Sequence, residues 1–465
     1  MAKKKKDPNQ VGMFKFVSWV LNGTSLAVEF VLLGYLMLYS TSVLGLHAGL
    51  LGTVLLVSKI LDGVVDLFFG ILIDRTNTRW GRGRPYDLFV IVLWVATWLL
   101  FSTPVDASAT FKYAWIFIFY TLSQTVARSL LQAAGLAYQV RAFNNDSIYI
   151  KLNSWGGILT TLFIMVFNII APIILARLGS DAGAWSRTML FISIPMCVMG
   201  MLRFFAVKEV YEVDVKTDVV KFSDFFRLFK HNKFVVSLFL FSFLVNCTSG
   251  IGLGTYFFQY VVGDLAVAGY LGISGIIPII TLALYPFILK RYTIKQLIIA
   301  TSLLALPAAF ITYYLYTSLF ALAIAGILNG ISTMASSYML SVLLIDQSNY
   351  NESQGLPRME GVIAGLSSFF NNTGASVGAF LGGLALTVVN LQSGVETQSA
   401  ETIEGIRLLH SFLPAVGILI SLIALHFYKY DAIKPKIDQE LKEKRNQQEN
   451  NATVELATGI EGEGF

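Results

Sequence analysis

The stretch SKILDGVVDLFFGILIDRTNTRWGRGRPY, residues 58–86, carries two aspartates inside an apolar segment and then a group of arginines. Asp62 and Asp66 are four residues apart, so on a helix both carboxylates project from one face, one turn apart. An ionisable side chain at membrane depth costs about 2.5–3.5 kcal/mol on insertion scales, and such side chains usually face a cavity or an ion path. The pair therefore predicts a Na⁺ or H⁺ site inside a membrane-spanning helix.

The composition is that of a membrane protein. The 465 residues are 55% hydrophobic and 14% charged, with a mean hydropathy of +0.65, whereas soluble domains are about 25% charged. The lysines and arginines behind the net charge of +5 concentrate in the tail and the loops, which indicates membrane topology and not nucleic-acid binding. Cys197 and Cys247 lie in separate apolar runs, so neither a disulfide framework nor a zinc site is predicted.

Twelve apolar segments are long enough to cross a bilayer, which takes about 20 residues each. They are 14–41, 48–74, 86–103, 111–138, 152–177, 188–207, 234–262, 267–289, 296–316, 319–345, 361–391 and 406–428. The polar segment between the sixth and seventh spans divides them six and six, and its stretch FSDFFRLF predicts a short amphipathic helix on the membrane surface. The predicted organisation is a basic tail 1–13, an N-terminal half 14–207, a linker 208–233, a C-terminal half 234–428 and a partly disordered tail 429–465.

Basic side chains gather on one side of the membrane when these spans alternate in direction. They are Lys3–Lys6, Arg75, Arg79, Arg82, Arg84, Lys290, Arg291, Lys295 and those of the C-terminal tail. The opposite loops 104–110 and 392–405 contain none. The positive-inside rule therefore predicts a multi-pass protein of the cell membrane with both termini in the cytoplasm, the first residues being a retained tail.

The span pattern, two halves of six joined by a long loop, resembles the major facilitator superfamily. Basic segments follow both the second and the eighth span, as two related halves would predict. A broken-helix transporter would instead have Gly/Pro-interrupted first and sixth spans, and the first span has Gly23 but no proline. The predicted fold class is an all-α integral membrane protein with twelve transmembrane helices in the major facilitator arrangement.

Four stretches also resemble the glycoside–pentoside–hexuronide:cation symporters, the family of the melibiose and glucuronide carriers. In the second span and the loop after it, the matching residues are Asp62, Asp66, Gly70, Asp74, Thr78, Arg79, Trp80, Gly81 and Pro85. The other stretches are YLMLYSTSVLGL (35–46), TYFFQYVVGD (255–264) and LIDQSNYNESQGLPRMEGVIAGLSSF (344–369).

The resemblance implies that Asp62 and Asp66 are the cation-site carboxylates. Lys59, one turn before Asp62, shares their face and can neutralise one of them, and the alternative is a structural Lys59–Asp62 pair that carries no ion. Sodium-using members supply a further carboxylate from the fourth span, where this chain has the uncharged residues 129–132. Since Na⁺ takes several oxygen ligands and H⁺ needs one base, the expected coupling ion is H⁺ in preference to Na⁺, with no other cofactor.

The sugar-binding aspartate of the melibiose carrier falls on Leu26 in this chain. Glu29 lies nearly one turn further along, on roughly the face of Asn22 and Ser25, and either replaces that acid or is a second protonatable group. Arg128 in the fourth span pairs either with a protein carboxylate, such as Glu29, or with a carboxylate of the substrate; the second alternative would favour hexuronides.

Further polar and aromatic side chains in the spans complete the predicted site. Asn371 and Asn372 occupy the stretch where the family often has a lysine facing the substrate. The predicted substrate-binding residues are Glu29, Asn22, Ser25, Lys59, Arg128, Gln132, Trp155, Asn246, Tyr338 and Asn372. The predicted gating residues are Asp74, Arg75, Arg79 and Arg82, whose ion pairs would latch the halves in one access state; plain positive-inside anchoring is the alternative. Gly374, Gly378 and Gly382 predict a close helix–helix contact.

Together these features predict a secondary active symporter that imports a sugar or glycoside with H⁺ or Na⁺ by alternating access. No nucleotide-binding motif, metal cluster or catalytic triad is visible, so the chain is not expected to be an enzyme. The alternatives are a carrier for hexuronides or another acidic solute and, in a different class, a sugar sensor that does not transport. The expected partners are a small-molecule sugar and the lipid bilayer, without nucleic acid, and a monomer suffices.

Overall fold

The computed structural model describes residues 12–76, 78–143, 146–210, 228–282, 284–356, 359–437, 439–440 and 443. The predicted basic tail, most of the linker with its surface helix, and most of the C-terminal tail lie outside these residues, as do the side chains of Asp66, Asp74 and Arg75. Within the described ranges the regular structure is helical, apart from one bridge between Thr78 and Gly81.

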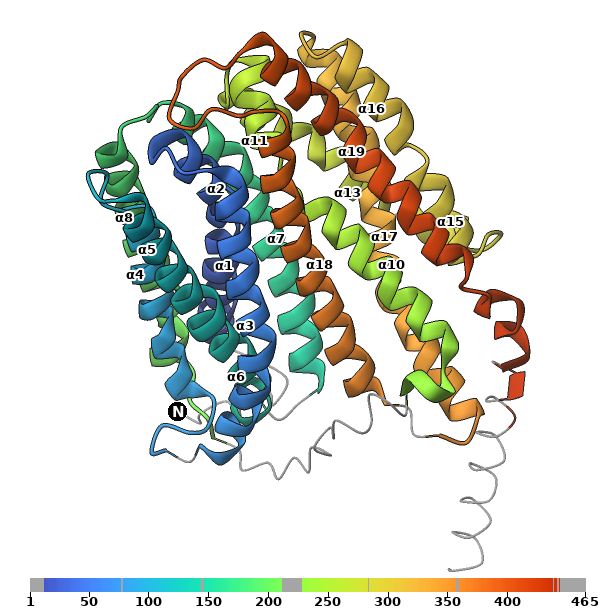
Figure 1. Ribbon diagram of the computed structural model, residues 1–465. Coiled ribbons are helices and arrows are strands. Elements are labelled where there is room, and N and C mark those ends of the chain that lie inside the picture. The colour runs from blue at the N-terminus through green and yellow to red at the C-terminus, as the bar shows by residue number, and fades with distance from the viewer. Residues whose placement is uncertain are drawn as a thin grey trace, which may run out of the picture.

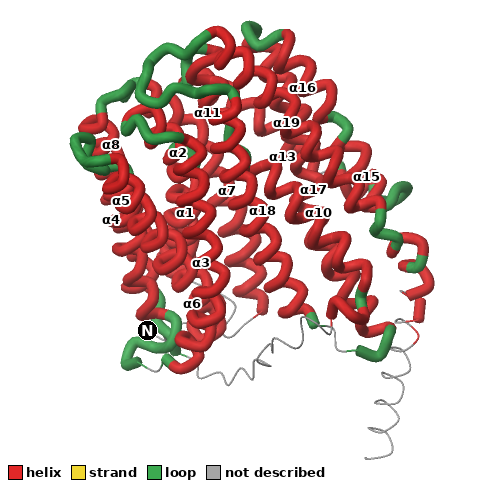
Figure 2. The backbone as a smooth tube through the Cα atoms, viewed as in Figure 1, coloured by secondary structure: helices red, strands yellow, loops and turns green. Residues whose placement is uncertain are grey.

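The helices of the two halves stand side by side and run between the same two ends of the molecule (Figures 1 and 2). The N-terminal half contains α1 (Met13–Leu33), α2 (Leu36–Leu38), η1 (Tyr39–Val43), α3 (Ala48–Arg75), η2 (Arg84–Leu88), α4 (Phe89–Leu100), α5 (Ala109–Tyr120), η3 (Thr121–Arg128), α6 (Ser129–Ala142), α7 (Asp146–Ala176) and α8 (Ala182–Ala206). The C-terminal half contains α10 (Lys233–Gly250), α11 (Gly254–Tyr256), η4 (Phe257–Val262), α12 (Ala266–Gly272), η5 (Ile273–Gly275), α13 (Ile276–Leu282), α14 (Tyr285–Ile288), α15 (Ile294–Ser302), α16 (Ala305–Tyr314), α17 (Leu319–Ser353), α18 (Glu360–Val388), α19 (Ala400–His426) and η6 (Tyr430–Ala432).

Consecutive elements join into passes from one end to the other (Figure 1). The order of the described elements groups into twelve such passes. We call the end that holds η1 and η4 the upper end and the end that holds Met13 and η2 the lower end, as in Figure 1. Among the described residues, seven helical segments are both long and apolar enough to cross a membrane by length and composition. The helix α3 is continuous from Ala48 to Arg75 and carries the charged side chains of the predicted site.

The first pass of each half ends in a π-helix, η1 in one half and η4 in the other. A π-turn is wider than an α-turn and is most often found at functional positions. The two π-helices meet at the upper end, where Thr41 Oγ1 lies 2.7 Å from the Tyr256 hydroxyl and Ser42 Oγ lies 2.9 Å from the Tyr260 hydroxyl. The loop after α18 adds two bonds, from Gly394 N to Thr41 O and from Ser393 Oγ to Leu46 O.

These four contacts form what we call the upper seam. Between described residues, all hydrogen bonds that join the two halves belong to it. Glycines bring the backbones together just below: a Cβ on Gly383 of α18 would lie 2.6 Å from Ala48 O of α3, and one on Gly269 of α12 would lie 2.3 Å from Ile169 O of α7. The two halves are therefore held together at their upper ends.

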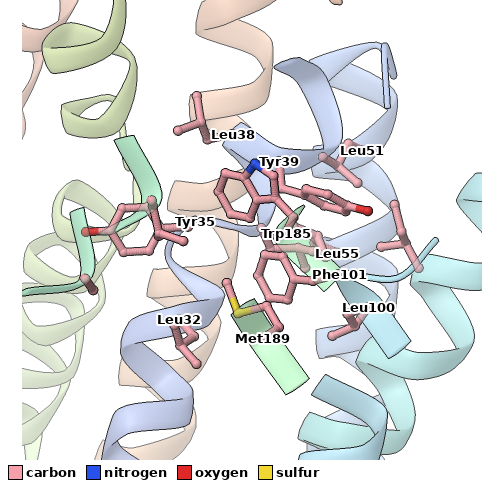
Figure 3. Close-up of a cluster of buried hydrophobic side chains, with 14 of the residues drawn as sticks. Leu32, Tyr35, Leu38, Tyr39, Leu51, Leu55, Leu100, Phe101, Trp185 and Met189 are labelled. Atoms are coloured by element: carbon pink, nitrogen blue, oxygen red, sulfur yellow. The ribbon is translucent and has the colours of Figure 1, made fainter. Parts of the chain in front are cut away.

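A buried aromatic cluster supports the N-terminal side of this seam (Figure 3). The Tyr39 ring lies 5.3 Å from Trp185 and 5.2 Å from Phe101, and Phe101 stacks on Trp185 at 5.9 Å between centroids. Tyr39, Phe101 and Trp185 come from η1, the loop after α4, and α8, so the cluster ties the end of the first pass to two neighbours. Large buried rings of this kind contribute much of the packing energy of a core.

The predicted glycine contact is confirmed on α18, whose face packs against α10. A Cβ placed on Gly378 would lie 2.0 Å from Cys247 O, and Gly374 and Gly382 meet Phe243 O and Ile251 O in the same way. Close backbone approach of this kind takes the place of hydrophobic driving force between helices in a membrane.

We expect Gly378→Ala to lower the thermal unfolding temperature of the detergent-solubilised protein, because the added methyl group forces α18 away from α10. Overpacking of this kind costs about 1–3 kcal/mol. Gly365→Ala is the matched control on the same helix, since a Cβ at that position meets no atom within 4 Å. Equal unfolding temperatures for the two variants would contradict the close contact.

Candidate functional site

The carboxylate of Glu29, on α1, is fully buried and is surrounded by donors from two other elements. Arg128 Nη1 donates to Oε2 at 2.7 Å, and Gln124 Nε2 and Ser123 Oγ donate to Oε1 at 2.6 and 2.8 Å. Thr97 of α4 adds a longer bond of 3.2 Å to Oε1. Two partners were predicted for Arg128, a protein carboxylate or a substrate carboxylate, and in this structure Arg128 pairs with the protein carboxylate of Glu29.

Three of these donors come from η3, the π-helix between α5 and α6. Its wider turn brings Ser123, Gln124 and Arg128 to one carboxylate. The Arg128 guanidinium also donates to Leu26 O at 3.1 Å and lies 5.2 Å from the centre of the Phe30 ring. The arginine is thereby held against α1 on both sides of Glu29.

A second ion pair, partly buried, lies nearby on α3. Lys59 Nζ donates to Asp62 Oδ2 at 2.9 Å, and Ser129 Oγ donates to Asp62 Oδ1 at 3.1 Å. Ser58 on the same helix contacts Thr121 of η3 at 2.8 Å between hydroxyl oxygens, so α3 and η3 are fixed to each other at this level. The predicted sharing of a face by Lys59 and Asp62 is confirmed.

The two ion pairs are neighbours, because Arg128, which bonds Glu29, and Ser129, which bonds Asp62, are consecutive residues. We call Glu29, Lys59, Asp62 and Arg128 the charged cluster; it contains two acids and two bases. Each acid is paired with a base, as buried charges must be in a medium of low polarity. A proton or cation that binds an acid of this cluster therefore competes with an internal base.

Asn22 and Ser25 lie on the same face of α1 as Glu29, two turns and one turn earlier, and they contact other partners. Asn22 Nδ2 donates to Gly200 O, and Ser25 Oγ donates to Met196 O, both at 2.8 Å. Ser25 Oγ also accepts a bond from the Trp94 indole at 2.8 Å. Both side chains thus fasten α1 to α8 in this structure, and their predicted contact with substrate stays a prediction.

Four other predicted residues have exposed side chains. Trp155 on α7 is 60% exposed and Tyr338 on α17 is 50% exposed. Gln132 on α6 and Asn372 on α18 are exposed as well. Asn246 instead donates to Asn371 Oδ1 at 3.1 Å, so the asparagine of α18 that this helix pair uses is Asn371.

The loop after α3, where gating was predicted, is held by a residue that the sequence did not single out. The Glu209 carboxylate accepts bonds from the backbone N–H groups of Arg82, Gly83 and Arg84, at 2.9, 2.8 and 2.6 Å. Gly81 has a φ of +115° and would place a Cβ 2.4 Å from this carboxylate, so both its backbone and its space require glycine. Glu209 lies just after α8, at the start of the predicted linker.

The predicted gating side chains that are described make contacts within the N-terminal half. The Arg79 guanidinium lies 5.0 Å from the centre of the Trp80 ring, and Arg82 uses its backbone N–H toward Glu209. Since Asp74 and Arg75 are outside the described side chains, the latch between the halves stays a prediction.

Two bundled halves joined at one end, with paired charges buried inside one of them, define a membrane transporter of the major facilitator type. The family described as MFS/sugar transport protein matches residues 23–432, and the chain belongs to this family. It is 27% identical to the isoprimeverose transporter of Lactiplantibacillus pentosus, over 89% of this chain and 88% of that protein. It is also 27% identical to the glucuronide carrier protein homolog of Escherichia coli, over 88% and 89% of the two chains.

Solved structures show the same fold at low sequence identity. A bacterial homolog of the human lysosomal transporter Spinster superposes with a TM-score of 0.63 at 14% identity, covering 93% of this chain and 99% of the other. These comparisons confirm the predicted family, the predicted major facilitator fold and the prediction that the chain is a transporter and not an enzyme.

Proposed function

We propose that this chain is a secondary active symporter that carries a sugar or glycoside into the cell together with a proton. The observation that carries the proposal is the partly buried Lys59–Asp62 pair on α3, with Nζ and Oδ2 2.9 Å apart. The sequence resemblance implies that Asp62 is a cation-site carboxylate. The kinship with sugar carriers supports the substrate class.

A proton suits the immediate surroundings of Asp62 better than Na⁺ does. One carboxylate oxygen is bonded to Lys59 and the other to Ser129. A proton needs a single lone pair, so it has only to displace the lysine ammonium from Oδ2. Na⁺ would have to collect several oxygen ligands around an acid that is already bonded on both oxygens.

Coupling then follows from charge balance. Protonation of Asp62 leaves Lys59 without its partner, and the resulting buried positive charge favours a rearranged state that sugar binding can stabilise. With the predicted cytoplasmic termini, the upper seam closes the outer end of the path. Import requires the seam to open, sugar and proton to bind, and the seam to close again as the lower ends separate.

We expect membrane vesicles in weakly buffered, sodium-free medium to alkalinise the outside when isoprimeverose is added without an energy source. The pH rise reports protons that enter with sugar. The same measurement is made with a second sugar, methyl glucuronide, and these two sugars form the test panel. Vesicles without the protein are the control. The experiment is repeated in medium that contains Na⁺. Sodium-dependent sugar uptake without a pH change would overturn the proton as the coupling ion. Absence of both a pH change and uptake, with every sugar in both media, would overturn the sugar symport.

A hexuronide carrier is the second candidate, because a relative is named a glucuronide carrier homolog. In that case Arg128 would have to exchange Glu29 for the carboxylate of the sugar. The three bonds that Arg128, Gln124 and Ser123 make to Glu29, all between 2.6 and 2.8 Å, oppose such an exchange. An alkaline shift with methyl glucuronide alone would favour this candidate.

A further inference from the structure

A cavity of about 380 Å³ lies beside the upper seam, and both halves of the protein line it. One wall comes from η1, the end of α7 and the turn that follows α7. The opposite wall comes from η4 and the loop after α18. The volume is within the range of about 300–1,000 Å³ that is usual for small-molecule sites. We call this space the seam cavity.

The seam cavity depends on the closed seam, because seam residues form part of its walls. Ser42 lines it from the N-terminal half, and Tyr260 and Gly394 line it from the C-terminal half. Each of the three makes a bond of the upper seam: Ser42 Oγ lies 2.9 Å from the Tyr260 hydroxyl, and Gly394 N donates to Thr41 O at 2.9 Å. Separation of the upper ends would break these bonds and move the two walls apart.

A ligand in contact with both walls therefore binds the seam-closed state better than the seam-open state. By linkage, such a ligand shifts the equilibrium toward the closed seam by its difference in affinity for the two states. The four residues of the charged cluster are absent from the lining, so this site is separate from the proposed cation site. Occupation of the seam cavity would slow every cycle that requires the seam to open.

The polar groups of the lining define the chemistry of the ligand. Among the described residues that line the seam cavity, Glu396 is the one that carries a charge. Glu396 and Ser180 are exposed, so the cavity opens to the surface at the upper end. Hydroxyl and amide groups of Ser42, Ser180, Gln259 and Tyr260 supply further donors and acceptors. A ligand that carries one positive charge and several hydroxyl groups matches this set.

The remaining surroundings agree with a small cation and not with an anion. Apolar side chains complete the walls and suit the C–H surface of a small ring: Leu38, Leu175 and Leu265. The basic residues that are nearest in sequence, Arg177 and Arg187, do not line the cavity, and Arg187 Nη2 lies 3.7 Å from Asp181 Oδ2. An acidic sugar would meet the Glu396 carboxylate without a counter-charge, which disfavours its binding.

We propose that the seam cavity is an inhibitory site for a small hydroxylated amine, such as an amino sugar, that binds from the outer side and holds the upper seam closed. Its ammonium group would pair with Glu396, and its hydroxyl groups would bond to Gln259 and the two serines. This inference goes beyond the proposed function. It requires only that the upper seam opens during transport, and it is independent of the identity of the transported sugar and of the coupling ion.

The first test is the binding of glucosamine to the detergent-solubilised protein, measured by isothermal titration. We expect Glu396→Gln to raise the Kd about fivefold, as the loss of one exposed ion pair predicts. Glucose should bind the unmodified protein about as weakly as glucosamine binds this variant. Glu401→Gln is the control, because Glu401 is an exposed acid in the first turn of α19 and lies outside the lining. An unchanged Kd for glucosamine in Glu396→Gln would overturn the ion pair and with it the proposal.

A second variant tests the cavity without a change of charge. Gln259→Leu removes an amide from the wall of the C-terminal half and should weaken the binding of glucosamine and of glucose by the same factor. Binding of both sugars unchanged by Gln259→Leu would place them elsewhere on the protein and would overturn the site.

The inhibition is tested in right-side-out vesicles as uptake of labelled isoprimeverose, with glucosamine outside at ten times its Kd. The maximal uptake rate should fall by up to about tenfold, and saturating isoprimeverose should not restore it, because every cycle passes through the seam-closed state that the amine binds. Glu396→Gln should take up the sugar normally and resist the amine. Full relief by saturating isoprimeverose would show that the amine competes for the transport site and would overturn the proposal. If the unmodified protein takes up no sugar, the sugar symport is overturned, and the binding measurements still decide on the seam cavity.

Discussion

Asp62→Asn is expected to abolish uphill accumulation of sugar while downhill exchange of labelled for unlabelled sugar continues. The amide keeps the shape of the carboxylate and offers one oxygen acceptor, toward Lys59 or toward Ser129, in place of two, and it cannot take up a proton at any physiological pH. Without proton uptake the gradient has no means of driving transport, so internal sugar should stop at the external concentration. Accumulation and counterflow in the same vesicles separate the two activities.

The matched control is Asp106→Asn, which makes the same chemical change at an exposed position in the loop between α4 and α5. It should accumulate sugar like the unmodified protein. Normal accumulation by Asp62→Asn would remove Asp62 from the coupling mechanism and leave the Lys59–Asp62 pair as a structural contact. Loss of counterflow together with accumulation would show that the residue is needed for substrate binding.

The second large effect is expected from Arg128→Met, which leaves the fully buried Glu29 without its cation. Removing one partner of a buried ion pair costs about 3–5 kcal/mol, whereas replacing both by neutral groups is often harmless. The double variant Glu29→Gln with Arg128→Met should therefore recover the stability of the unmodified protein to within about 1 kcal/mol. The thermal unfolding temperature in detergent is measured for the unmodified protein, the single variant and the double variant. The control is Gln132→Ala, at an exposed position one helical turn after Arg128.

The same double variant distinguishes a structural Arg128 from a substrate-binding one. A structural pair predicts that the double variant carries neutral sugars and hexuronides in the same ratio as the unmodified protein. Selective loss of hexuronide transport would show that Arg128 contacts the substrate. Failure of the double variant to regain stability would contradict the ion pair itself.

The sequence predicted those parts of the site that lie within one helix. Lys59 and Asp62 are three residues apart, and helical periodicity alone places them together. The Glu29–Arg128 pair, 99 residues apart, was one of two alternatives, because membrane charges need partners but the sequence does not say which. Apolar span lengths likewise predicted the helical bundle.

The remaining contacts depend on how the helices pack, which the sequence alone did not reveal. Ser123 and Ser129 are small hydroxyls among many. They become part of the site because Ser123 lies in the π-helix η3 and Ser129 directly after it, at the start of α6, where they reach Glu29 of α1 and Asp62 of α3. Glu209 is 127 residues from Arg82, whose backbone it contacts, and no periodicity connects them. Asn22 and Ser25 shared the predicted face, yet their closest acceptors are carbonyls of α8.

The upper seam sets an energy scale for the transport cycle. It consists of four hydrogen bonds, each contributing about 0.5–1.5 kcal/mol net, so their separation costs roughly 2–6 kcal/mol. A ligand can shift a conformational equilibrium only by its difference in affinity for the two states, and a reversal from 1:99 to 99:1 takes about 5.5 kcal/mol. The bonds of the seam are thus weak enough for the sugar and the proton of the proposed symport to decide on which side of the membrane the binding site opens.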